Sequence, residues 1–327
     1  MNSTRTGPSR RWRIALCMAV LAGSGVAACG EGGDDSSPAA IATIDVATQP
    51  IADLAPLYLG DAKGFFAEER IDVRPHVSQA GAIVASVVSG EFQFGWLSTT
   101  ALITARSKGL PVRVLRRFVR GGATPEESSA DLLVRADGPV RTPKDLEERT
   151  IGVVGLRGVS TLTTNAALEK QGVDVSKIKY LEVPFPQAVA ALESGRVDAA
   201  YVAEPFATLG LRAGHRSISR PILETAPDFI VAGYFTTEKY VAGHRDVVNR
   251  FERAVNRSFD YASTHPDEVR AVLSTYTEIP AGVARQMRLP DFSSFTDTRT
   301  LDLTASLAQK YGYIEKAPDI SELLYGG

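Results

Sequence analysis

The sequence predicts an α/β fold in two lobes, and three observations carry that prediction. From Ala42 onward, short apolar segments alternate with helical segments, which is typical of a mainly parallel sheet with helices on both faces. A twelve-residue pattern occurs twice, at 84–95 and 189–200, and each copy is an apolar-faced helix that ends near a glycine and leads into a buried strand. At 327 residues, the chain is also longer than a domain of ~150 residues needs.

The composition is that of a globular protein. The chain is 44% hydrophobic and 23% charged, which excludes a disordered chain and a collagen or coiled-coil rod. It carries 36 Lys and Arg against 38 Asp and Glu, and four of the arginines lie in the first 28 residues, so the remainder is mildly acidic. A nucleic-acid partner is therefore not expected, because binding by counterion release needs a clustered basic face.

The first 28 residues have the pattern of a secretory signal peptide. Four arginines precede an apolar run at 14–22, and small residues follow at Val26-Ala27-Ala28. The run is shorter than the ~20 apolar residues that span a bilayer. Ser9-Arg10-Arg11 hints at a twin-arginine signal, so both that route and the general secretory route stay open.

Val26-Ala27-Ala28-Cys29 resembles the lipobox of bacterial lipoproteins, although that motif prefers Leu where Val26 stands. The resemblance implies cleavage before Cys29, acylation of Cys29 and a lipid anchor on the outer face of the cytoplasmic membrane or on the periplasmic side. Residues 29–41 are rich in Gly, Ser and Asp and are expected to be a flexible tether. The only other cysteine is Cys17, inside the signal, so no disulfide or thiol nucleophile is expected in the body.

The elements of the first lobe follow from apolar periodicity and from helix start and stop signals. Asp53 is positioned to cap the first helix, while Gly90 and Gly109 end the next two. Strands are predicted at 43–48, 71–73, 92–95 and 112–115, and helices at 54–66, 82–89 and 98–108.

A second lobe follows, bracketed by two extended segments. Thr142-Pro143 starts a helix, and Ile151–Val154 is a strand. The extended runs at 131–135 and 229–235 are predicted to be hinge crossings, and the chain from His244 onward is predicted to be helical and to pack back on the first lobe. The expected organisation is a signal peptide (1–28), a tether (29–41), the first lobe (42–134), the second lobe (135–232) and the return to the first lobe with C-terminal helices (233–327).

A search for catalytic motifs finds none. The chain lacks both glycine-rich nucleotide motifs, the Gly-x-Ser-x-Gly elbow and a His-Glu-x-x-His pair, and its four histidines lie far apart in the sequence. Neither a cofactor, a metal nor an enzyme activity is therefore expected. Three polar loops that open helices, at 78–81, 98–100 and 158–161, instead offer donors at the carboxyl ends of strands, where an anion or a polar oxygen can be held.

Six motifs in order resemble the solute-binding proteins of ABC importers. The resemblance is to the SsuA-like branch for taurine, alkanesulfonates, nitrate and pyrimidine precursors, and it covers about Ile44 to Tyr240. The motifs are Ala55–Glu69, Ser89–Gly95, Ala105–Val112, Thr142–Leu146, Glu193–Ala200 and Glu204–Phe206.

This resemblance implies a fold and a function. The fold is the two-lobed periplasmic-binding-protein fold (type II), with a ligand cleft between the lobes. The function is capture of a small polar or anionic molecule (a sulfonate, carboxylate, nitrate or a pyrimidine or aromatic compound) by a monomer that delivers it to a permease driven by a cytoplasmic ATPase. Arg70 stands where the family usually has Gly, and Arg157 lies in a loop that is commonly small and polar.

The resemblance also implies which residues line the cleft. Arg157 would pair with an anion or be solvated, Glu204 would accept from a ligand amine or start a helix, and Trp96 would stack on the ligand or belong to the core. The expected lining residues are Gln49, Pro50, Gln79, Ala80, Gly81, Trp96, Ser98, Thr99, Arg157, Gly158, Ser160, Thr161 and Glu204.

Two other functions remain open at this point. One is an enzyme of the same fold that acts on a pyrimidine or tetrapyrrole precursor, although the pyrimidine-forming enzymes use a Cys-rich motif and this chain has no Cys after Cys29. The other is a sensor that reports ligand to a membrane kinase.

Overall fold

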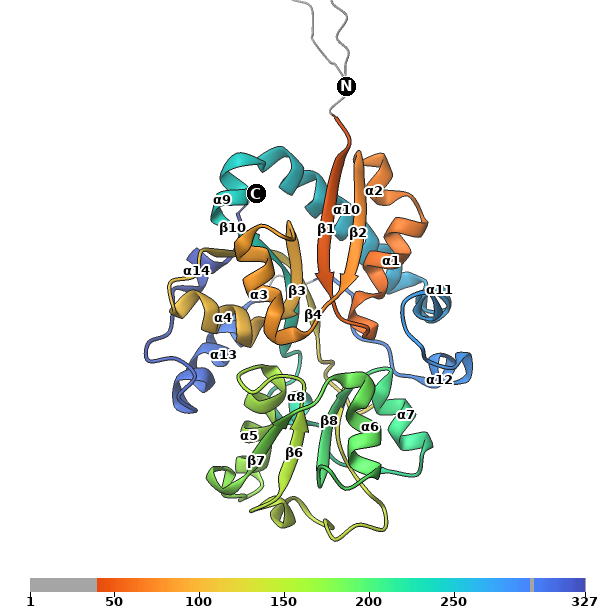
Figure 1. The fold of residues 1–327 in the computed structure, drawn as a ribbon, viewed down its shortest axis with the longest axis vertical. Coiled ribbons are helices and arrows are strands. Elements are labelled where there is room, and N and C mark those ends of the chain that lie inside the picture. The colour runs from red at the N-terminus through yellow and green to blue at the C-terminus, as the bar shows by residue number, and fades with distance from the viewer. Residues whose placement is uncertain (1–39, 295–296, 327) are drawn as a thin grey trace, which may run out of the picture. The chain divides into compact units, whose positions relative to one another are not determined.

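The computed structural model describes residues 40–294 and 297–326, which form two five-stranded sheets surrounded by helices (Figure 1). The predicted signal peptide, the lipidation site Cys29 and all but the last two residues of the predicted tether lie outside the described residues. All of the described residues belong to one compact unit that begins at Ala40.

The first sheet has the strand order β2-β1-β3-β10-β4. Its central strands β1 and β3 are parallel to each other, and β10 inserts antiparallel between β3 and β4. The strands are β1 (Ala42–Thr48), β2 (Ile71–Val77), β3 (Phe94–Ser98), β4 (Val112–Arg120) and β10 (Ile230–Thr237).

The second sheet repeats this arrangement with the order β7-β6-β8-β5-β9. Here β6 is parallel to β7 and β8, and β5 inserts antiparallel between β8 and β9. The strands are β5 (Ala130–Val134), β6 (Thr150–Val153), β7 (Lys179–Glu182), β8 (Ala199–Ala203) and β9 (Arg216–Ser219). Both sheets are therefore mixed, and the prediction of a mainly parallel sheet is wrong for the pairs that β5 and β10 make.

The two predicted hinge crossings are core strands. The runs at 131–135 and 229–235 largely coincide with β5 and β10, whose side chains are buried on both faces of the sheets. The chain passes from the first sheet to the second within 121–129 and returns within 226–229. Apolar runs of this kind fit an extended crossing and a buried strand equally well, because periodicity alone does not show burial on both faces.

Short helices connect the strands of the first sheet. The predicted helix 54–66 is instead a 3-10 turn at Ala52–Leu54 followed by α1 (Ala55–Ala62) and α2 (Phe65–Glu68). Gly64 separates the two helices with φ +78°, a left-handed conformation that glycine adopts without strain. The helices α3 (Ala80–Ser89) and α4 (Thr99–Ser107) are followed by Gly90 and Gly109, both with positive φ as predicted.

The second sheet is connected by α5 (Val159–Lys170), α6 (Phe185–Glu193), α7 (Phe206–Arg212) and α8 (Pro221–Thr225). A 3-10 turn at Val175–Lys177 precedes β7. The helix that Thr142-Pro143 was expected to start is a single 3-10 turn, Pro143–Leu146, which a capping box between Thr142 and Asp145 stabilises.

The C-terminal segment is helical, as predicted. It consists of α9 (Glu238–Gly243), α10 (Arg245–Thr264), α11 (Pro266–Val272), a 3-10 turn (Leu273–Thr275), α12 (Ala281–Gln286), α13 (Arg299–Lys310) and α14 (Ile320–Leu323). The long helix α10 packs on the first sheet, where Phe251 stacks on Phe94 with ring centroids 4.0 Å apart. Not all of the segment returns to the first sheet, because α12 contacts α7 and α13 contacts both α4 and α5.

Candidate functional site

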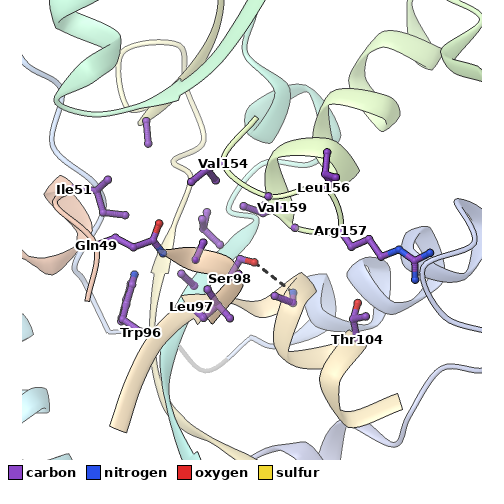
Figure 2. A pocket seen from close by; sticks show the side chains of 18 of the residues that line it. Gln49, Ile51, Trp96, Leu97, Ser98, Thr104, Val154, Leu156, Arg157 and Val159 are labelled. Atoms are coloured by element: carbon purple, nitrogen blue, oxygen red, sulfur yellow. Dashed lines mark hydrogen bonds between the residues drawn. The ribbon is translucent and has the colours of Figure 1, made fainter. Parts of the chain in front are cut away.

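A cavity of about 420 Å³ is lined by residues from both sheets. It lies where β1, β3, β6 and β8 end, so the first residues of the following loops and helices form its wall. Figure 2 shows Gln49, Ile51 and Trp96 at one end of it and Leu156 and Arg157 at the other.

Seven of the predicted site residues line this cavity and six do not. Those that line it are Gln49, Ala80, Gly81, Trp96, Ser98, Arg157 and Gly158. Those outside its lining are Pro50, Gln79, Thr99, Ser160, Thr161 and Glu204.

The buried hydroxyls among these residues hold backbone in place. Thr99 donates to the carbonyl oxygens of Ile230 and Val231, at 2.9 and 3.3 Å, and so ties α4 to β10. Ser160 donates to the carbonyl of Gly155 at 3.3 Å, and Thr161 donates to the carbonyls of Leu156 and Gly158, both at 3.1 Å. These two hydroxyls therefore shape the loop that carries Arg157.

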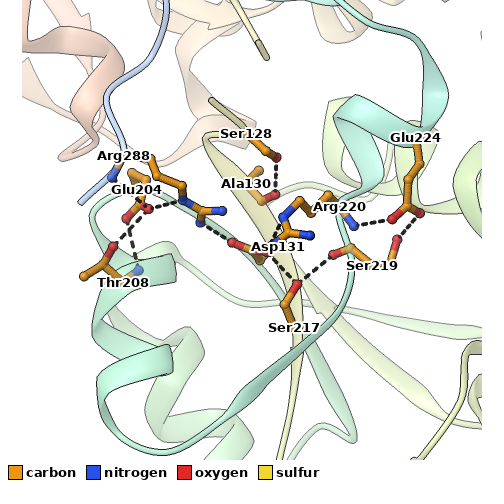
Figure 3. Close-up of polar contacts among 10 residues, drawn as sticks. All are labelled: Ser128, Ala130, Asp131, Glu204, Thr208, Ser217, Ser219, Arg220, Glu224 and Arg288. Atoms are coloured by element: carbon orange, nitrogen blue, oxygen red, sulfur yellow. Dashed lines mark hydrogen bonds and ion pairs between the residues drawn. The ribbon is translucent and has the colours of Figure 1, made fainter. Parts of the chain in front are cut away.

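Glu204 is a helix-start carboxylate within a buried ion network (Figure 3). It is 1% exposed and accepts from the amide and the hydroxyl of Thr208, both at 3.0 Å, at the beginning of α7. Burial raises the pKa of Glu204, and the positive charge of Arg288 opposes that rise. Of the two roles that the sequence left open for Glu204, the geometry fits the start of a helix.

Trp96 belongs to the core and to the cavity wall at once. Its side chain is fully buried and packs edge-to-face on Tyr234, with ring centroids 4.7 Å apart. Within the part of the chain that the structure describes, its indole Nε1 has no hydrogen-bond partner. The indole N–H is therefore a buried donor without an acceptor, which costs free energy.

Arg157 stands at the rim. It is exposed, and in Figure 2 its guanidinium points away from Gln49 and Trp96. Burial raises the pKa of Tyr313 in the C-terminal segment, and a hydrogen bond with Thr161 and the charge of Arg157 oppose that rise.

Asp53 is the lining residue that the sequence analysis assigned to a different role. It was expected to cap a helix, but neither α1 nor the preceding 3-10 turn has a side-chain cap. Asp53 is 5% exposed and lines the cavity, and burial raises its pKa to about 7, a rise that a hydrogen bond from its own backbone amide opposes. An acid inside the apolar run from Ile51 to Leu59 is the signal that could have found it.

The rest of the cavity wall is mostly apolar. The charged lining residues Lys108, Arg157 and Glu182 are exposed, in contrast to Asp53. The larger apolar side chains that line the cavity are Ile51, Val84, Leu97, Leu110, Val154, Leu156, Val159, Phe185, Ile222 and Val231. Such a wall suits a ligand with an apolar body and few polar groups.

The described residues contain neither a cluster of metal ligands nor a helix that could cross a membrane. Among residues 40–294 and 297–326, no group of three or more His, Cys, Asp or Glu side chains could hold a metal ion. In the same part of the chain, no helix is both long and apolar enough to cross a membrane.

Comparison with known proteins gives a family match and several relatives. The model of the family described as NMT1/THI5 like matches residues 51–269. The riboflavin-binding protein RibY of Chloroflexus aurantiacus is 26% identical over 231 residues, which are 69% of this chain and 63% of that protein. This match therefore spans less than two thirds of the relative.

Two further relatives differ in what their names describe. The formylaminopyrimidine-binding protein of Halalkalibacterium halodurans is 26% identical over 268 residues, covering 80% of this chain and 78% of that protein. The 4-amino-5-hydroxymethyl-2-methylpyrimidine phosphate synthase of Candida albicans is 22% identical over 241 residues, covering 66% of this chain and 65% of the synthase.

A solved structure shows the same fold. The ligand-binding component of an ABC-type import system from Staphylococcus aureus superposes with a TM-score of 0.74 at 14% identity, covering 87% of this chain and 96% of that one. The predicted fold class, a two-lobed α/β fold of the type II periplasmic-binding-protein kind, is confirmed.

Proposed function

The chain belongs to the NMT1/THI5-like family, and from that membership we propose that it is an exported solute-binding protein that delivers a small molecule to an ABC permease. The observation that carries the proposal is the cavity, which receives its wall from the strand ends of two sheets. The relatives named as binding proteins for riboflavin and formylaminopyrimidine support it.

Binding would be coupled to movement of the two lobes. The chain crosses between the sheets at 121–129 and 226–229, so we place the hinge there and assign β5 to the second lobe and β10 to the first. This moves the expected boundaries at 134–135 and 232–233 toward the N-terminus, to 121–129 and 226–229. A ligand that touches both lobes favours the closed arrangement, because it interacts more strongly with that state than with the open one.

An enzyme of the same fold is the second candidate, since one relative is named as a synthase. The cavity lining argues for binding instead. Its side chains include neither Cys nor His. Of the four lining residues that carry hydroxyls, Ser98 and Thr104 are engaged with the backbone of α4, and the other two are Ser129 and Tyr201. A nucleophile with an adjacent base, which covalent catalysis needs, is not among them.

A thermal-shift screen of the full chain separates these functions. The panel contains sulfonates, small carboxylates, nitrate, pyrimidines, flavins and aromatic acids, because a molecule that binds only the folded state raises the unfolding midpoint. A solute that raises the midpoint, saturates in calorimetry and is recovered unchanged after incubation supports the proposal. Conversion of the solute to product would identify an enzyme, and a panel without any response would remove the solute-binding function.

We also propose that the mature chain is held at the membrane surface as a monomer by a lipid on Cys29. The lipobox resemblance and the tether composition of the residues that follow support this. A single acylated N-terminus would serve as the anchor.

A further inference from the structure

We propose that Asp53 selects the ligand, and that the ligand presents a nitrogen-based hydrogen-bond donor on a flat, largely apolar body. This inference rests on the proposed solute-binding function and specifies the chemistry of its site. It differs from the expectation of an anion paired with Arg157.

The first argument is the position of Asp53. Its carboxyl is almost completely buried, yet it lines the cavity. Among residues 40–294 and 297–326, no ion pair joins Asp53 to a basic side chain. Apart from its own backbone amide, no donor in the described part of the chain bonds the Asp53 carboxyl. A buried carboxylate with so few donors is costly, so the further hydrogen bonds that would stabilise it would come from the molecule in the cavity.

The second argument is the charge around Asp53. Burial raises the pKa of the phenols of Tyr201 on β8, Tyr234 on β10 and Tyr276 after α11, and the negative charge of Asp53 adds to each rise. Since no ammonium or guanidinium group in the described part of the chain pairs with Asp53, a ligand anion placed beside it would be repelled. A neutral N–H or a protonated nitrogen would be attracted.

The third argument is two further polar groups in the cavity lining. Trp96 Nε1 is a buried donor without a partner, and the side-chain amide of Gln49 makes no hydrogen bond within the described part of the chain. Figure 2 shows Gln49 and Trp96 toward the same end of the cavity. Asp53 offers a carboxyl acceptor, Trp96 an indole donor, and Gln49 an amide that can donate or accept. This set matches a ligand whose edge carries both hydrogen-bond donors and acceptors.

The fourth argument is the apolar wall. A small hydrated anion such as nitrate would lose its water against Ile51, Leu97 and Val231 without recovering equivalent hydrogen bonds. The two cationic lining residues, Lys108 and Arg157, are exposed, whereas Asp53 is buried. A nitrogen heterocycle that fills the apolar space and directs its polar edge to Asp53 satisfies both parts of the cavity.

Three probes with one ring system test this. They are 2-aminoquinoline, which carries a donor beside its ring nitrogen, 2-methylquinoline, which has the same shape without the donor, and quinoline-2-carboxylate, which is anionic. Their dissociation constants are measured by calorimetry with the full wild-type chain, with Asp53→Asn and with the matched control Asp61→Asn, an exposed residue of α1 outside the cavity lining.

In the wild type and in Asp61→Asn we expect 2-aminoquinoline to bind at least about tenfold more tightly than 2-methylquinoline, because a charge-assisted hydrogen bond provides a difference of this size. Quinoline-2-carboxylate should bind most weakly of the three. In Asp53→Asn the amino preference should fall below about threefold. Equal affinities, a preference for the carboxylate, no binding of any quinoline, or an unchanged amino preference in Asp53→Asn would overturn the inference. The proposed solute-binding function is tested separately, by the thermal-shift screen of solutes.

Discussion

Arg288 Nε lies 3.0 Å from Oε1 of Glu204, and the same guanidinium also pairs with Asp131 (Figure 3). Both carboxylates have fully buried side chains in the second lobe, whereas Arg288 belongs to the segment that follows α12. Ser217 donates to Asp131, and Thr208 donates to Glu204. One arginine thus fastens the C-terminal segment to the ends of β5 and β8.

Arg288→Met should therefore destabilise the protein strongly. The substitution leaves the buried Glu204 without its cation and leaves Asp131 with only Arg220, whose Nε is 3.7 Å away, and breaking a buried pair from one side costs about 3–5 kcal/mol. Urea unfolding measures the loss. The matched control is Arg253→Met, which removes an ion pair to Glu69 in which the arginine side chain is 56% exposed, and it should cost less than about 1 kcal/mol. Equal losses in the two variants would contradict this account.

The buried carboxyl of Asp53 should make stability depend on pH in a defined direction. Its pKa is about 7 in the folded chain, above the ordinary value of 3.8, so the folded chain keeps a proton that the unfolded chain releases between those values. The contribution of Asp53 to stability therefore declines as pH rises from about 4 to about 7, by a total on the order of 4 kcal/mol.

Asp53→Asn should remove this decline. The variant and the wild type should have similar unfolding free energies near pH 4, and the variant should be more stable by a few kcal/mol near pH 8. Urea titrations across this range measure the difference, with Asp137→Asn in an exposed loop as the control. A variant that is no more stable than the wild type at pH 8 would show that Asp53 is not held in an unfavourable buried position.

Trp96 should report ligand binding through its emission rather than through its exposure. In a Trp12→Phe background it is the only tryptophan. Because the ring is fully buried, iodide should quench it weakly even without ligand, while a ligand acceptor at Nε1 should change its emission with the dissociation constant found by calorimetry. Strong iodide quenching in the ligand-free protein, or emission that does not change when a confirmed ligand binds, would show that Trp96 is not a buried part of the cavity wall.

Arg157→Ala should change the affinity for 2-aminoquinoline by less than about twofold, because an exposed charge is screened by solvent. Its guanidinium is exposed and points away from the buried end of the cavity. Calorimetry checks this against Arg196→Ala, an exposed arginine outside the lining. A loss of about tenfold, the effect of a charge-assisted hydrogen bond, would restore the direct contact that the sequence suggested.

Membrane attachment should depend on Cys29. Cells that express Cys29→Ser should show no fatty-acid label on the protein, whereas Cys17→Ser, which alters the only other cysteine, should stay labelled. Incorporation of labelled palmitate and membrane fractionation measure this. Label that persists in Cys29→Ser, or wild-type protein without an acyl chain, would refute the lipobox interpretation.

Local chemistry made much of the fold predictable. The helix ends at Gly90 and Gly109 depend on a conformation that glycine adopts freely, and both glycines have the expected positive φ. The amphipathic helices after His244 follow from the 3.6-residue period of their apolar positions. These signals lie within a few residues of the element that they determine.

The remaining features depend on residues that are distant in the sequence. Asp53 is buried partly because Tyr276, whose hydroxyl donates to the carbonyl of Ile51 at 3.0 Å, covers this turn from more than two hundred residues away. The side chains of Thr99 and Glu204 could bind a ligand or hold the protein's own structure, because a hydroxyl and a carboxylate suit both roles. Their structural role is shown only by their partners, which are the Ile230 carbonyl on β10 for Thr99 and Arg288 after α12 for Glu204. Sequence patterns do not reveal such pairings.

The insertion of β10 between β3 and β4 has a consequence for synthesis of the chain. When β4 has left the ribosome, its partner is still about 110 residues away, which at usual elongation rates is a delay of roughly 5–20 s. All five strands of the second sheet, by contrast, are made before β10. The nascent chain can therefore complete its second sheet first, while the facing edges of β3 and β4 remain open to wrong partners until Ile230–Thr237 arrives.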